Sequence, residues 1–267
     1  MAQLADLTKE SLLMGDIKNL LEIYEETAAE QCRLFREKIL STRDFLEQLA
    51  VLSVAVGADL ENLTVKKSKT AAVFLSASEG MYGNLISLVF SEFLKTAKTA
   101  ADNKTDLVVI GALGRQLMQE LAPQLKYQYL DMDEDFKPLL MGYGRLKVFY
   151  AKFKNVAVQQ AAGSELSGQM VQELIRQSGG KQPPLKFIYE PSLPEIAEKF
   201  NREIFHNLLA GMMEEHRLAK QAARLMQLDE AVDDLDVRLA GFKHLTRQEL
   251  KKAEDKKQQS RMVRFIQ

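Results

Sequence analysis

The last quarter of the sequence, residues 192–264, predicts one continuous helix too long for a compact domain of this size to bury. Pro191 ends the extended run before it, and Ser192 with Glu195 forms a capping-box pattern at the first turn. Pro194 falls in that turn, where its missing N–H breaks no hydrogen bond, and no proline follows. Apolar side chains then recur at steps of three or four residues, close to the period of a coiled-coil seam: Leu218, Ala222, Leu225, Leu228, Val232, Leu235, Leu239, Phe242 and Leu245. At about 1.5 Å per residue the helix would reach roughly 100 Å, so it needs a partner along its length.

A matching stretch lies at the other end of the chain, where residues 12–56 contain no proline and one early glycine, Gly15. Its apolar stripe consists of Ile17, Leu20, Leu21, Tyr24, Ala28, Leu34, Phe35, Ile39, Leu46, Leu49 and Leu52. Residues 1–12 are expected to fray or to cap this helix. We predict that the two terminal helices pair antiparallel as one rod; separate packing of each helix in an ordinary bundle is the open alternative. The C-terminal side chains predicted to face the first helix are Leu225, Leu228 and Val232.

Between the two helices, short apolar runs alternate with helical patterns, which predicts parallel strands joined by right-handed crossovers. The predicted strands are residues 72–75, 106–111, 127–130, 147–153 and 185–189. The predicted helices are residues 85–94, a helix through Leu117 and Leu121, and a short helix or turn at 139–143. Residues 156–160 either continue the fourth strand or pair with it, and residues 165–181 are expected to form a loop.

The predicted fold class is therefore mixed α+β and α/β: a long antiparallel coiled coil of the terminal helices with a central α/β domain. The first part is an N-terminal coiled-coil helix, residues 1–60. The second is a Rossmann-like domain with a mostly parallel sheet, residues 61–190, and the third is a C-terminal coiled-coil helix, residues 191–267.

Composition narrows the possible functions. The formal net charge of −1 argues against a dedicated nucleic-acid binder, which would need a basic excess for phosphate contacts. Cys32 is the only cysteine, so no internal disulfide can form. There is no signal pattern at the N-terminus and no apolar run of membrane-spanning length, so any membrane association is expected to come through partners. His206, His216 and His244 are interpreted as surface residues rather than metal ligands.

Motifs for catalysis or cofactor binding are weak. Gly80 and Gly83 follow the first strand but do not form a dinucleotide fingerprint, and no P-loop is present, so a structural turn is preferred over an anion site. The segment 111–115 has the same ambiguity after the second strand. The carboxylates of residues 131–135 lack the glycine and terminal glutamate of a calcium loop and are interpreted as a solvated turn. No nucleophile has a base nearby, so we expect no catalytic, cofactor or metal site.

Several stretches, in order along nearly the whole chain, resemble the gamma subunit of rotary F-type ATP synthases. AARLMQLDEAVDD at 222–234 resembles that family's A-A-R-M-x-A-M-x-x-A-T-D-N segment, and YEPS at 189–192 resembles the entry to the same helix. KVFYAKFKN at 147–155 is similar to V-x-x-x-Y-x-K-F-x-N, and SEGMYG at 78–83 is similar to D-R-G-L-C-G. IKNLLEI at 17–23 weakly resembles V-K-N-T-Q-K-I.

The resemblance implies a central-stalk rotor that has no catalysis of its own. Such a rotor couples rotation to nucleotide turnover in the alpha and beta subunits and to ion translocation through the membrane ring. The implied partners are the alpha and beta subunits, an epsilon-type subunit and the c-ring, with no nucleic acid and with membrane contact only through partners. The implied location is peripheral, on the cytoplasmic side of the inner or plasma membrane. The alternatives are a coiled-coil scaffold derived from the same fold and, less favoured, a nucleotide-binding α/β enzyme.

The resemblance also marks candidate partner-contacting residues. They are Ile17, Lys18, Ile23, Glu25, Glu26, Arg224, Leu228 and Asp233. Two departures from the family pattern concern charge: Glu25 and Glu26 stand in a stretch that is basic in the family, and Glu79 stands where the family's turn is basic. Together with Glu22 and Glu30, the first pair forms an acidic face that is either solvated or faces a partner whose loop is basic or neutral.

Overall fold

The computed structural model divides into two units, residues 1–29 with 225–267 (unit 1) and residues 30–224 (unit 2). The residues whose structure it describes are 2–55, 69–100, 105–132, 136–167, 190 and 192–266. Each terminal helix begins in one unit and ends in the other.

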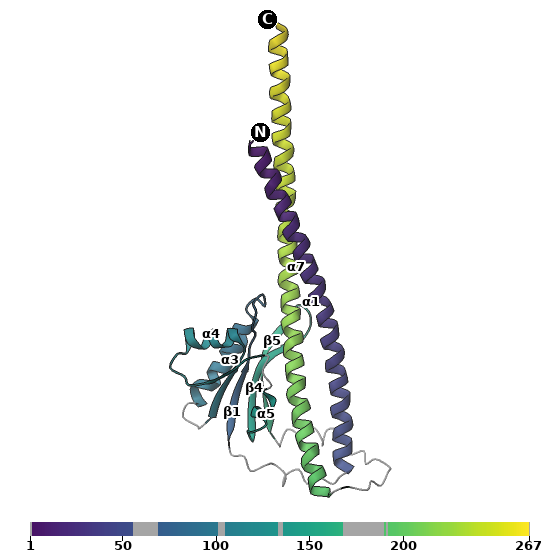
Figure 1. Cartoon of the computed structure of the whole chain (residues 1–267), viewed down its shortest axis with the longest axis vertical. Helices are drawn as coiled ribbons and strands as arrows, with labels where there is room; N and C mark the ends of the chain where they lie inside the picture. The colour runs from purple at the N-terminus through teal and green to yellow at the C-terminus, as the bar shows by residue number, and fades with distance from the viewer. Residues whose placement is uncertain are drawn as a thin grey trace. The chain divides into compact units, whose positions relative to one another are not determined.

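The two terminal helices pack together antiparallel, as predicted (Figure 1). Helix α1 spans Ala2–Ala55 and helix α7 spans Leu193–Ile266. The expectation that residues 1–12 fray or cap the helix is wrong, because α1 is already helical from Ala2. This first stretch contains no glycine or proline before Gly15, so nothing in its backbone interrupts the helix.

Contacts within each unit show the direction of the pairing. In unit 1, Lys18 Nζ lies 2.6 Å from Asp236 Oδ1. In unit 2, Lys38 Nζ lies 3.3 Å from Glu214 Oε1. Positions further along α1 therefore meet positions earlier in α7. The same order continues in a small apolar core that consists of Leu46, Leu49 and Ile204.

The central domain is built on a five-stranded sheet of order β3-β2-β1-β4-β5. The strands are β1 (Thr70–Leu75), β2 (Thr105–Ile110), β3 (Gln128–Leu130), β4 (Arg145–Phe153) and β5 (Gln159–Ser167). Where the structure describes the domain, its helices are α3 (Leu85–Ala100), α4 (Ala112–Leu121) and α5 (Lys137–Leu140). The first four strands are parallel and β5 is antiparallel to β4, which confirms the mostly parallel sheet.

Strand β5 differs from the prediction for this part of the chain. Residues 165–167, expected in a loop, are its last three residues, because the β4–β5 pairing runs through nine residues, from Arg145↔Ser167 to Phe153↔Gln159. Of the predicted segment 156–160, only Gln159 and Gln160 belong to the paired strand. The predicted strand 185–189 lies outside the described residues.

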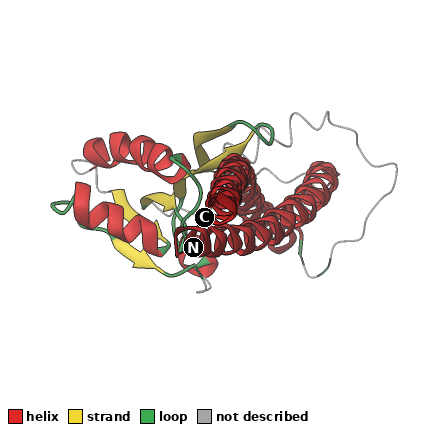
Figure 2. Cartoon of the chain, turned by 90° about the horizontal axis from the view of Figure 1, so that it is seen from above, coloured by secondary structure: helices red, strands yellow, loops and turns green. Residues whose placement is uncertain are grey.

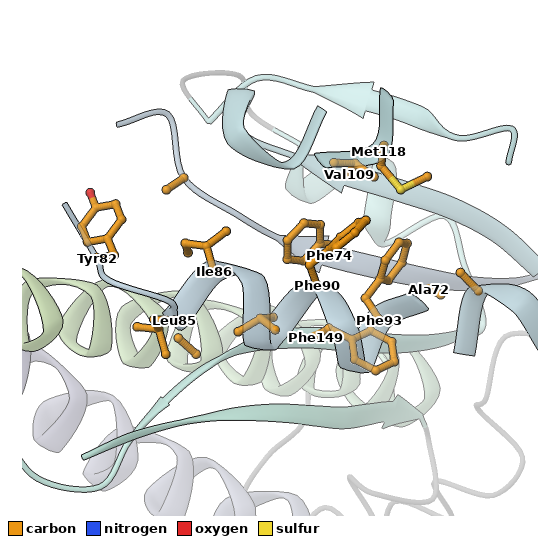
Figure 3. Close-up of a cluster of buried hydrophobic side chains, with 14 of the residues drawn as sticks. Ala72, Phe74, Tyr82, Leu85, Ile86, Phe90, Phe93, Val109, Met118 and Phe149 are labelled. Atoms are coloured by element: carbon orange, nitrogen blue, oxygen red, sulfur yellow. The ribbon is translucent and has the colours of Figure 1, made fainter. Parts of the chain in front are cut away.

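The sheet has helices on both faces, which makes three layers (Figure 2). Helices α3 and α4 cover one face, where four aromatic rings meet (Figure 3). The Phe74 ring stacks on Phe93 at 5.4 Å between centroids, and Phe93 meets the edge of Phe149 at 5.6 Å. Helix α5 and the lower part of α7 cover the other face, with Leu209 and Met212 of α7 in its core.

Candidate functional site at the carboxyl edge of the sheet

The order of the strands creates a switch point beside β1. The chain proceeds from β1 through β2 to β3 on one side, and β4 then joins β1 on the other side. In open α/β sheets, ligands bind in the crevice outside the carboxyl ends of the two strands that flank such a point. In this chain helix α7 brings His216, Lys220 and Arg224 to that edge, at a spacing of four residues that keeps them on one helical face.

His216 forms the innermost contact between α7 and the sheet. Its side chain is 1% exposed. The backbone N–H of Ala151 donates to Nδ1 at 3.0 Å, and Nε2 lies 2.8 Å from the carbonyl oxygen of Ser76. Because Nδ1 accepts, the proton of the neutral ring must be on Nε2, which donates to Ser76. Burial, with a smaller contribution from the Lys220 charge, lowers the pKa of His216 to about 3.

The prediction that all three histidines are surface residues is therefore wrong for His216. His206 is half-buried and His244 is exposed. A signal for the burial of His216 was present in the sequence: it lies four residues after Met212 and three before Ala219, which are both buried core residues of the same helical face.

Arg224 holds the turn that follows β1. Its Nη2 lies 2.9 Å from Glu79 Oε2, 3.0 Å from the Tyr82 hydroxyl and 3.3 Å from the Gly80 carbonyl. Its guanidinium also lies over the Tyr82 ring, 4.9 Å from the centroid. Burial raises the pKa of the Tyr82 hydroxyl. The turn itself needs a left-handed backbone at Met81 (φ 67°), which a bulky residue adopts only when its neighbours hold it there.

Lys220 lies between these two contacts and is 8% exposed. Its Nζ is 5.5 Å from the centre of the Tyr82 ring. Burial, followed by the like charges of Arg217 and Arg224, lowers the pKa of Lys220 to about 8, and Glu79 acts in the opposite direction. Side chains of α7 thus occupy the edge where a ligand would bind, and they join this helix to the sheet. The interpretation of residues 78–83 as a structural turn agrees with these contacts.

The candidate partner-contacting residues fall into two groups. Seven of them lie in unit 1, and Arg224, which is bound to the turn of its own chain, is the last residue of unit 2. Ile17 and Ile23 are exposed, the latter at 58%. Leu228 is fully buried, so its side chain belongs to the interior of the coiled coil, and we keep it out of the proposed contact surface.

The four charged candidates of unit 1 differ in what they contact. Lys18 donates to both carboxylate oxygens of Asp236, at 2.6 and 2.7 Å, and these bonds raise its pKa. Glu25 is half-buried, whereas Glu26 and Asp233 are exposed. These three carboxylates form no ion pair with any residue that the structure describes.

Among the described residues, the weaker sequence motifs have no convergent ligand set. The Asp131 carboxylate accepts the N–H of Met132 at 2.7 Å, and residues 133–135 of that acidic cluster lie outside the described residues. Within the described ranges, no three His, Cys, Asp or Glu side chains gather to hold a metal ion. No helix in those ranges has the length and hydropathy needed to span a membrane.

A family model described as ATP synthase matches residues 15–249. No curated protein matches the sequence significantly. The central stalk and c-ring structure of the Tetrahymena thermophila mitochondrial ATP synthase contains a similar chain, with 17% identity and a TM-score of 0.52 over 79% of this chain and 99% of that one. At this identity the likeness shows a shared fold.

Two further similar chains come from the mitochondrial ATP synthase of Euglena gracilis. The chain in its rotor structure is 13% identical with a TM-score of 0.45, covering 90% of this chain and 99% of that one. The chain in its OSCP/F1/c-ring structure is 15% identical with a TM-score of 0.48, covering 93% of this chain and 94% of that one.

Proposed function

This chain belongs to the gamma-subunit family of F-type ATP synthases, and we therefore propose that it is the rotor of such a complex. In this proposal unit 1 turns inside a ring of alternating alpha and beta subunits that hold the nucleotides. The central α/β domain binds an epsilon-type subunit and the c-ring, and the chain reaches the membrane only through these partners. The similar chain of Tetrahymena thermophila comes from a structure of the central stalk with its c-ring, which supports the c-ring as a partner.

The observation that carries the proposal is the apolar surface of unit 1. Large hydrophobic side chains on α1 point away from the coiled-coil interior: Leu12, Leu13, Ile17, Leu20, Ile23 and Tyr24, each between 49% and 66% exposed. On α7 of the same unit, Val237 is 74% exposed. Exposed apolar surface of this extent marks a contact with another protein, and a ring that surrounds the helix pair would cover it on several sides.

We assign no catalytic step to this chain itself. The carboxyl edge of the sheet, where a nucleotide would bind in related folds, is occupied by His216, Lys220 and Arg224 of α7. These contacts instead join α7 to the sheet: in this proposal rotation of the central domain reaches α7 through the buried hydrogen bonds of His216 to the backbone of Ala151 and Ser76.

Purification of the native complex through a tag on this chain tests the proposal. We expect P-loop alpha- and beta-type subunits in about threefold excess over this chain, with ATP hydrolysis that drives rotation of an attached probe. Recovery of the chain without ring subunits would reject the rotor and favour a scaffold. The isolated chain, free of contaminating ATPases, is expected to hydrolyse no ATP.

A further inference from the structure

Unit 1 separates its charges into two bands along its length. The first is an acidic band, to which α1 contributes Glu22, Glu25 and Glu26. Helix α7 contributes Asp229, Glu230, Asp233, Asp234 and Asp236. Residues 19–29 and 225–236 contain no lysine or arginine. The contact of Lys18 with Asp236 places these two stretches beside each other in the antiparallel pair.

The acidic band keeps most of its negative charge. Lys18 at its border neutralises part of it, with Nζ 2.6 Å from Asp236 and 3.5 Å from Glu22. The other six carboxylates form no ion pair with any residue that the structure describes. Glu26 and all five α7 carboxylates are exposed. A partner that surrounds this level meets an excess of carboxylate.

The second band is basic and lies further along α7. We call it the basic tip, and it consists of the exposed residues Lys243, Arg247, Lys251, Lys252, Lys256 and Lys257. Three carboxylates of α7 lie among these residues: Glu249, which pairs with Lys252 at 2.7 Å, Glu254 and Asp255. The first turns of α1 add Asp6, Lys9 and Glu10, and basic residues remain in excess. Helix α7 continues past the first residues of α1, so the end of the tip is a single helix (Figure 1).

The two bands together indicate the class of partner. A nucleic acid or an anionic lipid surface would attract the basic tip, but the acidic band would repel it. Exposed apolar side chains accompany both bands, with Ile23 and Tyr24 near the acidic one and Leu245 and Leu250 within the tip. Only a protein surface can offer cationic, anionic and apolar groups in a matching order.

We propose that unit 1 inserts into a protein bore that carries two charged collars in a fixed order. Lysine and arginine side chains of the bore face the acidic band, and aspartate and glutamate side chains face the basic tip. From Asp233 to Lys251 the helix rises about 27 Å, which is the expected spacing of the collars. The order of charges sets the depth of insertion, since sliding by one collar brings like charges together. This inference rests on the proposed function, which supplies the ring.

Zero-length carbodiimide cross-linking of the complex, purified with tagged wild-type chain, tests the contacts directly. The reagent joins amines only to carboxylates that touch them. We expect Lys251, Lys252, Lys256 or Lys257 joined to aspartate or glutamate of the ring subunits, and Glu26, Asp233 or Asp234 joined to ring lysines. Recovery of the ring without either kind of cross-link would overturn the collars.

Charge reversal measures what the contacts contribute. One variant changes Glu25, Glu26, Asp233 and Asp234 to lysine, and the other changes Lys251, Lys252, Lys256 and Lys257 to glutamate. The matched control changes four exposed lysines of the central domain to glutamate: Lys98, Lys126, Lys152 and Lys154. Each variant must keep the helical circular dichroism of the wild type. Glutamine substitutions at the same eight band positions give a second set of variants, in which the charge is removed but not reversed.

We expect either band reversal to release the ring at least about tenfold faster than the control in low salt, with a smaller loss for the glutamine variants. The difference from wild type should shrink as salt rises to about 1 M, where charges more than about 3 Å apart are screened. Release at the control rate by both band variants would overturn the inference while the rotor assignment stands. If the wild-type chain captures no ring, the proposed function is rejected, and this inference is rejected with it.

Discussion

His216 on helix α7 donates from Nε2 to the carbonyl oxygen of Ser76 across 2.8 Å, and this bond joins the C-terminal helix to the end of the first strand. The other ring nitrogen accepts from the backbone of β4, so one neutral imidazole connects α7 to both strands at the switch point. A protonated ring would turn Nδ1 into a donor that faces the N–H of Ala151. The pKa near 3 agrees with this geometry.

The free chain should therefore lose stability as the pH falls below about 6.5. The unfolded chain binds a proton at His216 near pH 6.5, whereas the folded chain does so only near pH 3, so the unfolded state holds the extra proton between these values. The slope approaches about 1.4 kcal/mol per pH unit, which amounts to about 2 kcal/mol between pH 7.5 and pH 5. Urea unfolding at several pH values measures it. His216→Gln should remove this slope and His244→Gln should keep it; equal slopes in both variants would contradict the assignment.

The pKa of Lys220 should shift in opposite directions when either of two neighbouring charges is removed. Arg224→Gln removes a neighbouring positive charge and should raise the pKa of Lys220 above its value of about 8. Glu79→Gln removes the carboxylate that opposes this effect and should lower the pKa further. NMR titration of the isotope-labelled lysine ε-carbon reads both directly. Shifts of the same sign in the two variants would show that Lys220 lies outside this cluster.

Two glycines in helices should respond oppositely to alanine. A Cβ at Gly114 on α4 would lie 2.8 Å from both Ser76 Cβ and Val109 Cγ1, so Gly114→Ala should cost roughly 1–3 kcal/mol of unfolding free energy through overpacking. Nothing lies within 4 Å of a Cβ at Gly241 on α7, so Gly241→Ala should stabilise the chain by about 0.5–1 kcal/mol. Chemical denaturation measures the unfolding free energy of both variants and of the wild type. A Gly114→Ala variant as stable as the wild type would mean that α4 can move away from the sheet.

Mutation can distinguish interior positions of the unit 1 coiled coil, which stabilise the free chain, from surface positions, which we propose contact the ring. Leu228 is fully buried, so Leu228→Ala should destabilise the free chain by about 2–5 kcal/mol. Val237 is 74% exposed, so Val237→Ala should change the stability of the free chain by no more than about 0.5 kcal/mol. In the assembled complex Val237→Ala should nevertheless weaken retention of the ring. If Leu228→Ala leaves the melting temperature of the free chain unchanged, the packing of α1 on α7 does not depend on this side chain.

Elements with a strong local pattern were predictable from the sequence. The paired helices follow from a repeat of three and four residues without proline, and strands β1 and β2 follow from short apolar runs between turn residues. The last residues of β5 were missed because Leu166 is a single apolar residue between the polar Ser164, Glu165 and Ser167, which is too little for a strand pattern. Their strand conformation comes from nine residues of pairing with β4, which is a long-range interaction.

The sequence by itself determined the pair of long helices and the largely parallel sheet between them, because both follow from the local periodicity of apolar residues. It also determined that no recognisable catalytic motif is present, because such motifs depend on residue type and spacing. Only the tertiary structure decided that His216, Lys220 and Arg224 meet the carboxyl edge of the sheet, since residues about 140 positions apart touch there. It also decided which charges of unit 1 lie side by side, because the register of Lys18 with Asp236 depends on how two distant helices pack.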